Sequence, residues 1–236
     1  MTLGTTRHTV DKMVTATTRR LHALLRPETL GLLVMVLAPV QYLLNIAFVF
    51  IQPEQPLTDP NSLYAVGRLG WLWQFGAIAA GLGLVAAALG LGQSLARGKR
   101  VRLGVTLVLI AGIAVIGTGV FPTDAPVDVE TVGFTTTGAL HLIFGLVGFL
   151  SIIVMLFVLK GVFKRDPRWA RASQLTAWLA WLVLVGVPAS IVLEGTTAGV
   201  VLRFVDPLVP WALWIGWLLR RLGRPNPQRE VAITPR

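Results

Sequence analysis

The chain alternates between long apolar stretches and short polar segments. Five stretches of 18 or more residues contain no Asp, Glu, Lys or Arg, at residues 30–51, 71–96, 103–121, 138–159 and 175–193. A helix of about 20 residues crosses the hydrocarbon core of a bilayer. Each stretch is therefore predicted to form a transmembrane helix.

A sixth apolar run, residues 207–219, is shorter than the others. Its rise of about 18 Å falls short of a hydrocarbon core of about 30 Å. Two arrangements would complete this crossing. Either the helix extends back through Asp206 and Arg203 towards Ala198, or Asp206 caps a short helix opened by Pro207 and the preceding segment re-enters the bundle. Both place Arg203 and Asp206 at or below the outer headgroup level.

Polar segments flank the apolar region on both sides. Residues 1–29 place apolar side chains at helical spacing between basic residues, which favours an amphipathic helix at the membrane interface, with a solvated tail as the alternative. Residues 222–236 are polar and contain proline, which indicates a loose tail. The sequence thus predicts an all-α, polytopic bundle of six transmembrane helices over residues 30–221, between a leader (1–29) and a tail (222–236).

Composition agrees with a membrane protein, since 54% of the residues are hydrophobic and 14% are charged. Arginine outnumbers lysine, and Ala, Gly, Val and Leu dominate, which favours a bacterial source. The absence of cysteine excludes disulfides, thiolate nucleophiles and Cys-ligated metal sites. The sequence also lacks Walker A, HExxH and GxSxG motifs, so the common ATPase, zincin and serine-hydrolase interpretations do not apply. No cofactor is expected.

The distribution of charge sets the expected orientation. Of 21 basic residues, all but Arg68 and Arg203 fall on one side of a six-helix topology, and the other side carries seven acidic residues. The positive-inside rule then places both termini in the cytoplasm of a multi-pass plasma-membrane protein. The net charge of +10 is expected to contact anionic lipid headgroups rather than nucleic acid.

Ionisable residues gather where the helices are expected to end on the outer side. Asp124 follows the third stretch, His141 lies near the start of the fourth, and Glu194 ends the fifth. With Arg203 and Asp206 they form a candidate outward-facing site, because ionisable groups at this depth are costly unless they are paired or functional. A satisfied polar cap that holds the helix ends explains the same residues, and both interpretations remain open. Arg203 is expected to pair with Asp206 or Glu194.

The first stretch carries polar side chains of its own. Gln41 and Asn45 are spaced to point in the same direction, beside Tyr42. Amide side chains in membrane bundles commonly hydrogen-bond between helices. We interpret this pair as a link between helices rather than as a site.

Short motifs at the helix ends resemble a known family. Gly119-Val120-Phe121-Pro122-Thr123-Asp124 ends the third stretch, Gly138-Ala139-Leu140-His141 opens the fourth, and Ala38-Pro39-Val40-Gln41 lies in the first. These motifs are similar to the bacterial and archaeal membrane family catalogued as domain of unknown function 998, and the resemblance covers most of residues 30–220. Gly67-Arg68-Leu69-Gly70 stands where that family usually has Ser-acid-Leu-Gly. The family name supplies no biochemistry.

Three functions fit these observations. The first is a non-enzymatic membrane protein that binds a lipid or a membrane-protein partner through its outer polar pocket. The second is a membrane-embedded hydrolase or transferase acting on a lipid, with His141 as base or metal ligand and with Asp124 and Glu194 as acids or ligands. The third is a small transporter, although the sequence shows no convincing inverted repeat.

Overall fold

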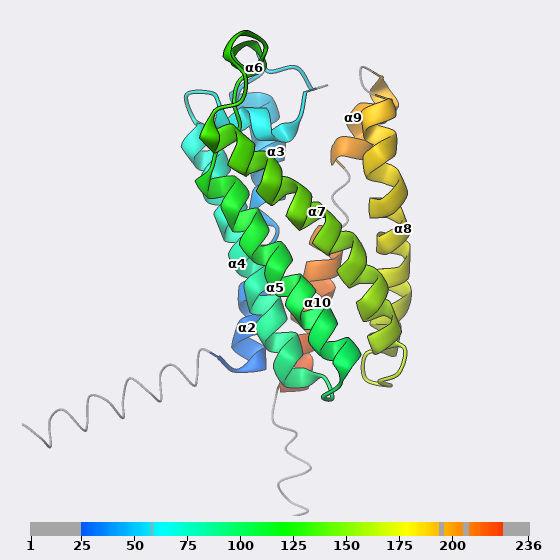
Figure 1. Ribbon diagram of the computed structural model, residues 1–236. Coiled ribbons are helices and arrows are strands. Elements are labelled where there is room, and N and C mark those ends of the chain that lie inside the picture. Colours follow the sequence, from blue (N-terminus) through cyan, green and yellow to red (C-terminus); the bar gives the residue numbers. More distant parts are fainter. Residues whose placement is uncertain (1–24, 58, 194–195, 205–207, 224–236) are drawn as a thin grey trace, which may run out of the picture.

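The computed structural model describes residues 25–57, 59–193, 196–204 and 208–223, which form helices and no strand (Figure 1). Residues 1–24 of the expected amphipathic leader and residues 224–236 of the expected tail lie outside the described residues. The elements in chain order are α2 (Pro27–Leu37), α3 (Val40–Ile51), the 3-10 helix η1 (Asn61–Ala65), α4 (Gly70–Ser94), α5 (Lys99–Val120), α6 (Pro126–Val132), α7 (Thr136–Phe163), α8 (Ala170–Val192), α9 (Thr197–Phe204) and α10 (Leu208–Gly223).

Five helical segments of the described chain are long and apolar enough to cross a membrane. They are Pro27–Ile51, Gly70–Ser94, Lys99–Val120, Thr136–Phe163 and Ala170–Ala189. These segments coincide with the five apolar stretches of the sequence, so the predicted all-helical membrane character is confirmed.

The first of these segments is broken into α2 and α3 at Pro39. Proline has no N–H to donate to the preceding turn, and its ring disfavours a straight helix. Ala38 and Pro39 keep near-helical dihedrals through the break. Hydrogen bonds also continue on both sides of it, from Ala38 N to Val34 O (3.1 Å) and from Leu43 N to Pro39 O (2.9 Å). The break gives the two halves different neighbours: α2 contacts α4 and α10, while α3 contacts α4.

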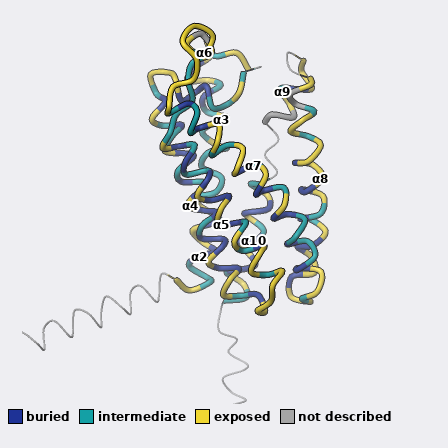
Figure 2. The backbone as a smooth tube through the Cα atoms, in the orientation of Figure 1, coloured by how far each residue is buried: buried dark blue, intermediate teal, exposed yellow. Residues whose placement is uncertain are grey.

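Helix α4 lies at the centre of the bundle. It contacts α2, α3, α5 and α10. Of the residues in its most apolar 18-residue stretch, 61% are buried, whereas the corresponding share is at most 39% in the other four membrane segments. Its glycines permit this close packing, since small residues let helix backbones approach. Figure 2 shows the buried residues on the inward faces of the helices and exposed residues on their outward faces. Large apolar side chains such as Trp71, Leu146 and Val185 are exposed there, as expected where lipid tails replace water.

The last apolar run forms a helix of 16 residues, α10. Helix α9 ends at Phe204 and packs on α8, whereas α10 begins at Leu208 and packs on α2, α4 and α8. Residues 205–207 lie outside the described chain. The described residues of this region therefore form two helices, and α10 alone is about 24 Å long, which is shorter than a hydrocarbon core.

The two ends of the bundle differ in charge. The start of α2, the α4–α5 loop, the α7–α8 turn and the end of α10 lie at one end, and η1, α6 and α9 lie at the other (Figure 1). The segments at the first end, called here the basic end, carry Arg26, Arg97, Lys99, Arg100, Arg102, Lys160, Lys164, Arg165, Arg168, Arg171, Arg220 and Arg221. The segments at the opposite, acidic end carry Glu54, Asp59, Asp124, Asp128 and Glu130 together with Arg68 and Arg203, and the basic end also carries Glu28 and Asp166.

Candidate functional site

Asp124 organises the start of α7 at the acidic end. Its Oδ2 accepts a hydrogen bond from Thr135 N (2.8 Å), and its Oδ1 accepts one from Thr135 Oγ1 (2.6 Å). Thr135 is the N-cap of α7, and its hydroxyl oxygen accepts a hydrogen bond from Gly138 N (3.1 Å). A carboxylate also interacts favourably with the partial positive charge at a helix N-terminus. Asp124 and Thr135 thus form a two-residue cap.

His141 organises the end of α5 from the neighbouring helix. Its imidazole is 7% exposed, and Nδ1 lies 2.8 Å from Phe121 O and 3.2 Å from Thr118 O. Carbonyl oxygens only accept hydrogen bonds, so Nδ1 carries a proton and donates to them. These carbonyls belong to the last turn and the C-cap of α5, where backbone acceptors lack partners within the helix. In the neutral ring, Nε2 is then the nitrogen that can accept a proton or a hydrogen bond.

The two family-like motifs therefore meet at one junction. The motif that ends α5 supplies the carbonyl of Phe121 and the carboxylate of Asp124, and the motif that opens α7 supplies Gly138 and His141. A Cβ on Gly138 would clash with the carboxylate of Asp124, so a larger residue here would require this carboxylate to move away from its place in the cap. Each motif contributes the cap for the other helix.

A second polar contact lies beside this junction. Asn45 Oδ1 accepts hydrogen bonds from Gln41 Nε2 (3.0 Å) and from Trp73 Nε1 of α4 (3.1 Å), which confirms the predicted hydrogen bond between helices. The ring centroids of Trp73 and His141 are 6.1 Å apart. Gln41 Oε1 is buried and has no partner among the described residues. Polar groups from α3, α4 and α7 thus lie together next to the α5–α7 junction.

Of the five residues in the predicted outer site, the structure describes the side chains of Asp124 and His141. Asp124 and His141 lie at the same junction, although they bond to different helix ends. Glu194 and Asp206 lie outside the described residues, and Arg203 belongs to α9 with its side chain outside the description. Among the described residues, no group of three or more His, Asp or Glu side chains could hold a metal ion. The convergence of all five residues stays a prediction.

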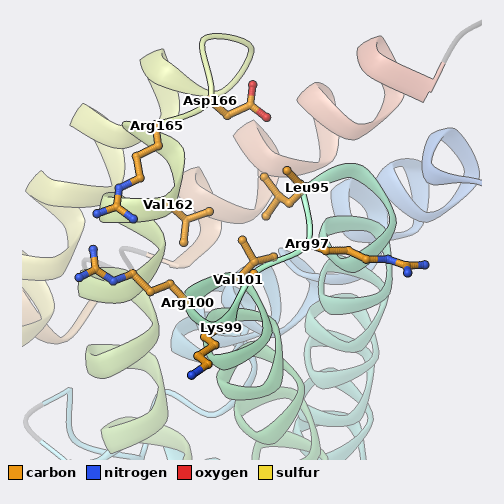
Figure 3. A pocket seen from close by; sticks show the side chains of 10 residues that line it. Leu95, Arg97, Lys99, Arg100, Val101, Val162, Arg165 and Asp166 are labelled. Carbon is orange, nitrogen blue, oxygen red and sulfur yellow. The ribbon is translucent and has the colours of Figure 1, made fainter.

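The basic end contains a cavity that the sequence did not single out. It has a volume of about 450 Å³ and lies between the loop before α5 and the turn after α7. Figure 3 shows the lining residues, which are Leu95, Ala96, Arg97, Gly98, Lys99, Arg100, Val101, Val162, Arg165 and Asp166. The signal in the sequence was the pair of basic clusters after the second and fourth stretches. That these two clusters share one cavity depends on how α5 packs against α7.

The acidic residue of this cavity already has a partner. Arg168 donates from Nε to Asp166 Oδ1 (3.0 Å) and from Nη2 to Asp166 Oδ2 (2.7 Å), and Nη2 also reaches Ser94 O (3.2 Å). The hydrogen bonds from Arg168 hold the pKa of Asp166 below its usual value, so the carboxylate stays ionised. This ion pair joins the α7–α8 turn to the end of α4.

Comparison with known proteins gives one match. No curated protein and no solved structure matches the chain. Residues 32–221 match the model of a family described as "Protein of unknown function (DUF998)", a range that runs from α2 to α10 and includes both capping motifs. The chain therefore belongs to this family of membrane proteins.

Proposed function

We propose that this protein crosses the plasma membrane six times, with both termini in the cytoplasm, and binds a lipid through a polar site at its acidic, outward-facing end. Two features support six crossings. The described chain begins and ends at the basic end, which requires an even number of crossings, and α9 and α10 together lead from the acidic end to the basic end (Figure 1). The concentration of Lys and Arg at the basic end favours a cytoplasmic location for that end.

The orientation can be tested with single cysteines, because the chain has none of its own. Asp128 in α6 and Lys99 at the start of α5 are both exposed and lie at opposite ends. In intact cells, an impermeant maleimide is expected to label Asp128→Cys but not Lys99→Cys, and permeabilisation should make both reactive. Equal labelling of the two variants in intact cells would rule out the proposed topology.

The proposed binding site rests on one observation, the geometry of His141. The imidazole is buried at the acidic end and held in one orientation by two carbonyl oxygens of α5. Because Nδ1 donates to these carbonyls, a ligand would donate its hydrogen bond to the other ring nitrogen, Nε2. The hydrogen-bonded group of Gln41, Asn45 and Trp73 lies nearby, and within it Gln41 Oε1 is a buried acceptor with no partner among the described residues. A lipid with hydroxyl or ammonium donors in its headgroup suits this combination of an acceptor, amides and an aromatic surface.

The two ring nitrogens have different partners, so they can be tested with a matched pair of variants. The amide of Asn occupies roughly the position of Nδ1, and the amide of Gln reaches roughly that of Nε2. We expect His141→Asn to retain thermal stability but to lower the amount of copurifying lipid about fivefold, the effect of one lost hydrogen bond. We expect His141→Gln to lose about 1 kcal/mol of stability while it keeps the lipid.

Both quantities are measured on the detergent-extracted protein. Native mass spectrometry gives the lipid bound per chain, and tryptophan fluorescence during heating gives the midpoint of unfolding. An unchanged lipid content in His141→Asn would mean that His141 only caps α5. Copurification of a protein in place of a lipid would assign the site to a membrane-protein partner.

A further inference from the structure

The cavity at the basic end brings together two guanidinium groups from distant parts of the chain. Arg100 lies in the first turn of α5, and Arg165 follows the end of α7. Both side chains line the cavity, and they point toward one another (Figure 3). In the same view, Arg97 points away from them and towards the opposite side. Among the basic side chains that line the cavity, Arg100 and Arg165 are therefore the two that converge.

The charge of this pair is not neutralised by the described part of the chain. Two ion pairs occur among the described residues, Arg26 with Glu28 and Arg168 with Asp166. Asp166 lines the cavity, but both of its oxygens accept hydrogen bonds from Arg168. Two cations held near each other repel, and an anion between them would remove this cost. The geometry thus favours an anionic ligand.

The rest of the lining identifies the kind of anion. Leu95 and Val162 are buried, and with Val101 they give the cavity an apolar wall beside its charged one. A free inorganic anion gains nothing from an apolar wall, whereas a lipid has an apolar body attached to its headgroup. The cavity also lies where α5 begins and α7 ends, which is the level of the headgroups in a membrane. Both features favour an amphiphilic ligand.

We propose that this cavity is a specific site for the phosphate group of an anionic membrane lipid, held between the guanidinium groups of Arg100 and Arg165. Guanidinium groups remain charged at all physiological pH values and bind phosphate through two parallel hydrogen bonds. Basic pockets between transmembrane helices bind anionic headgroups in this way. The glycerol and the first acyl carbons would lie against Leu95, Val101 and Val162. This site is separate from the one at His141, and it does not depend on the orientation of the chain in the membrane.

The test uses the full chain in phosphatidylcholine nanodiscs, titrated with short-chain phosphatidylglycerol and, separately, with inorganic phosphate. Binding is followed by the rise in the midpoint of thermal unfolding. The test variant is Arg100→Gln with Arg165→Gln. Its control is Arg102→Gln with Arg171→Gln, which removes the same charge from residues of the basic end that are exposed, as Arg100 and Arg165 are, but do not line the cavity. We expect phosphatidylglycerol affinity to fall at least about tenfold in the test variant and less than about twofold in the control.

Each outcome decides the proposal. Loss of the lipid effect in the test variant alone supports it. Equal losses in the two double variants would show that general surface charge attracts the lipid, and would overturn it. An equal response to inorganic phosphate, dependent on Arg100 and Arg165, would assign the site to free phosphate instead. In pure phosphatidylcholine we expect Arg100→Gln to raise the midpoint, because repulsion is relieved; a lower midpoint would show that Arg100 stabilises the fold, and would also count against the proposal.

Discussion

Replacement of Gly112 by alanine is expected to destabilise the bundle by about 1–3 kcal/mol, although it adds a single methyl group. Gly112 lies in α5 where this helix packs against α4. An added Cβ would lie 2.9 Å from Gly81 O and 3.0 Å from Val85 N. The relation is mutual, since a Cβ on Gly81 would lie 2.6 Å from Gly112 O. Backbone atoms cannot rotate away as a side chain can, so the two helices would have to separate.

The matched control is Gly145→Ala in α7. A Cβ at Gly145 would meet no atom within 4 Å. Alanine is a better helix former than glycine, so this variant is expected to be neutral or to gain about 0.5–1 kcal/mol. Thermal unfolding followed by tryptophan fluorescence in one detergent compares the two variants. If Gly112→Ala unfolds at the same temperature as Gly145→Ala, the close approach of α4 to α5 is not required for stability.

Replacement of Trp169 by alanine is expected to destabilise the protein by about 3–5 kcal/mol, as is usual for a large buried aromatic residue. Trp169 is fully buried in the α7–α8 turn, and its ring stacks on Phe163 with centroids 5.3 Å apart. Its backbone N donates to Asp166 O (2.9 Å), which fixes the turn. Loss of the indole would leave a cavity beneath the turn that connects the two helices.

Trp169→Phe provides the control for this change. The indole Nε1 of Trp169 is buried without a partner among the described residues. Phenylalanine retains the stacked ring and removes a donor that contributes only a desolvation cost, so we expect a change within about 1 kcal/mol. The free energy of unfolding in a denaturant series measures both variants. A loss in Trp169→Phe as large as that in Trp169→Ala would indicate that Nε1 does have a hydrogen-bond partner.

The transmembrane helices were predictable because apolar length is a local property of the chain. The break at Pro39 is local as well, since proline removes one hydrogen bond wherever it occurs in a helix. For the last run, the sequence left two arrangements open, and the described residues form the separate helices α9 and α10. The choice depends on packing of α9 against α8 and of α10 against α2 and α4, which a linear pattern does not contain.

The candidate site was predictable only in part. The sequence indicated that Asp124 and His141 lie near the same end of the bundle, and the structure places them at one junction. The sequence did not indicate that Asp124 would cap α7 or that His141 would bind carbonyls of α5. These bonds depend on the path of the chain through α6. The pair of Arg100 and Arg165 was missed for a similar reason: each belongs to an ordinary basic cluster at the end of an apolar stretch, and only the packing of α5 against α7 makes them neighbours.

The bonds between Asp124 and Thr135 also close the intervening segment into a loop with fixed ends. Within it, α6 ends at Val132 and is followed by Gly133, whose φ of 81° suits glycine and turns the chain back towards α7. The helix ends are held by residues outside α6, so the length and composition of this segment are uncoupled from the packing of the bundle. Substitutions and insertions in this segment are therefore expected to change the surface at the acidic end while the packing of the membrane helices stays the same.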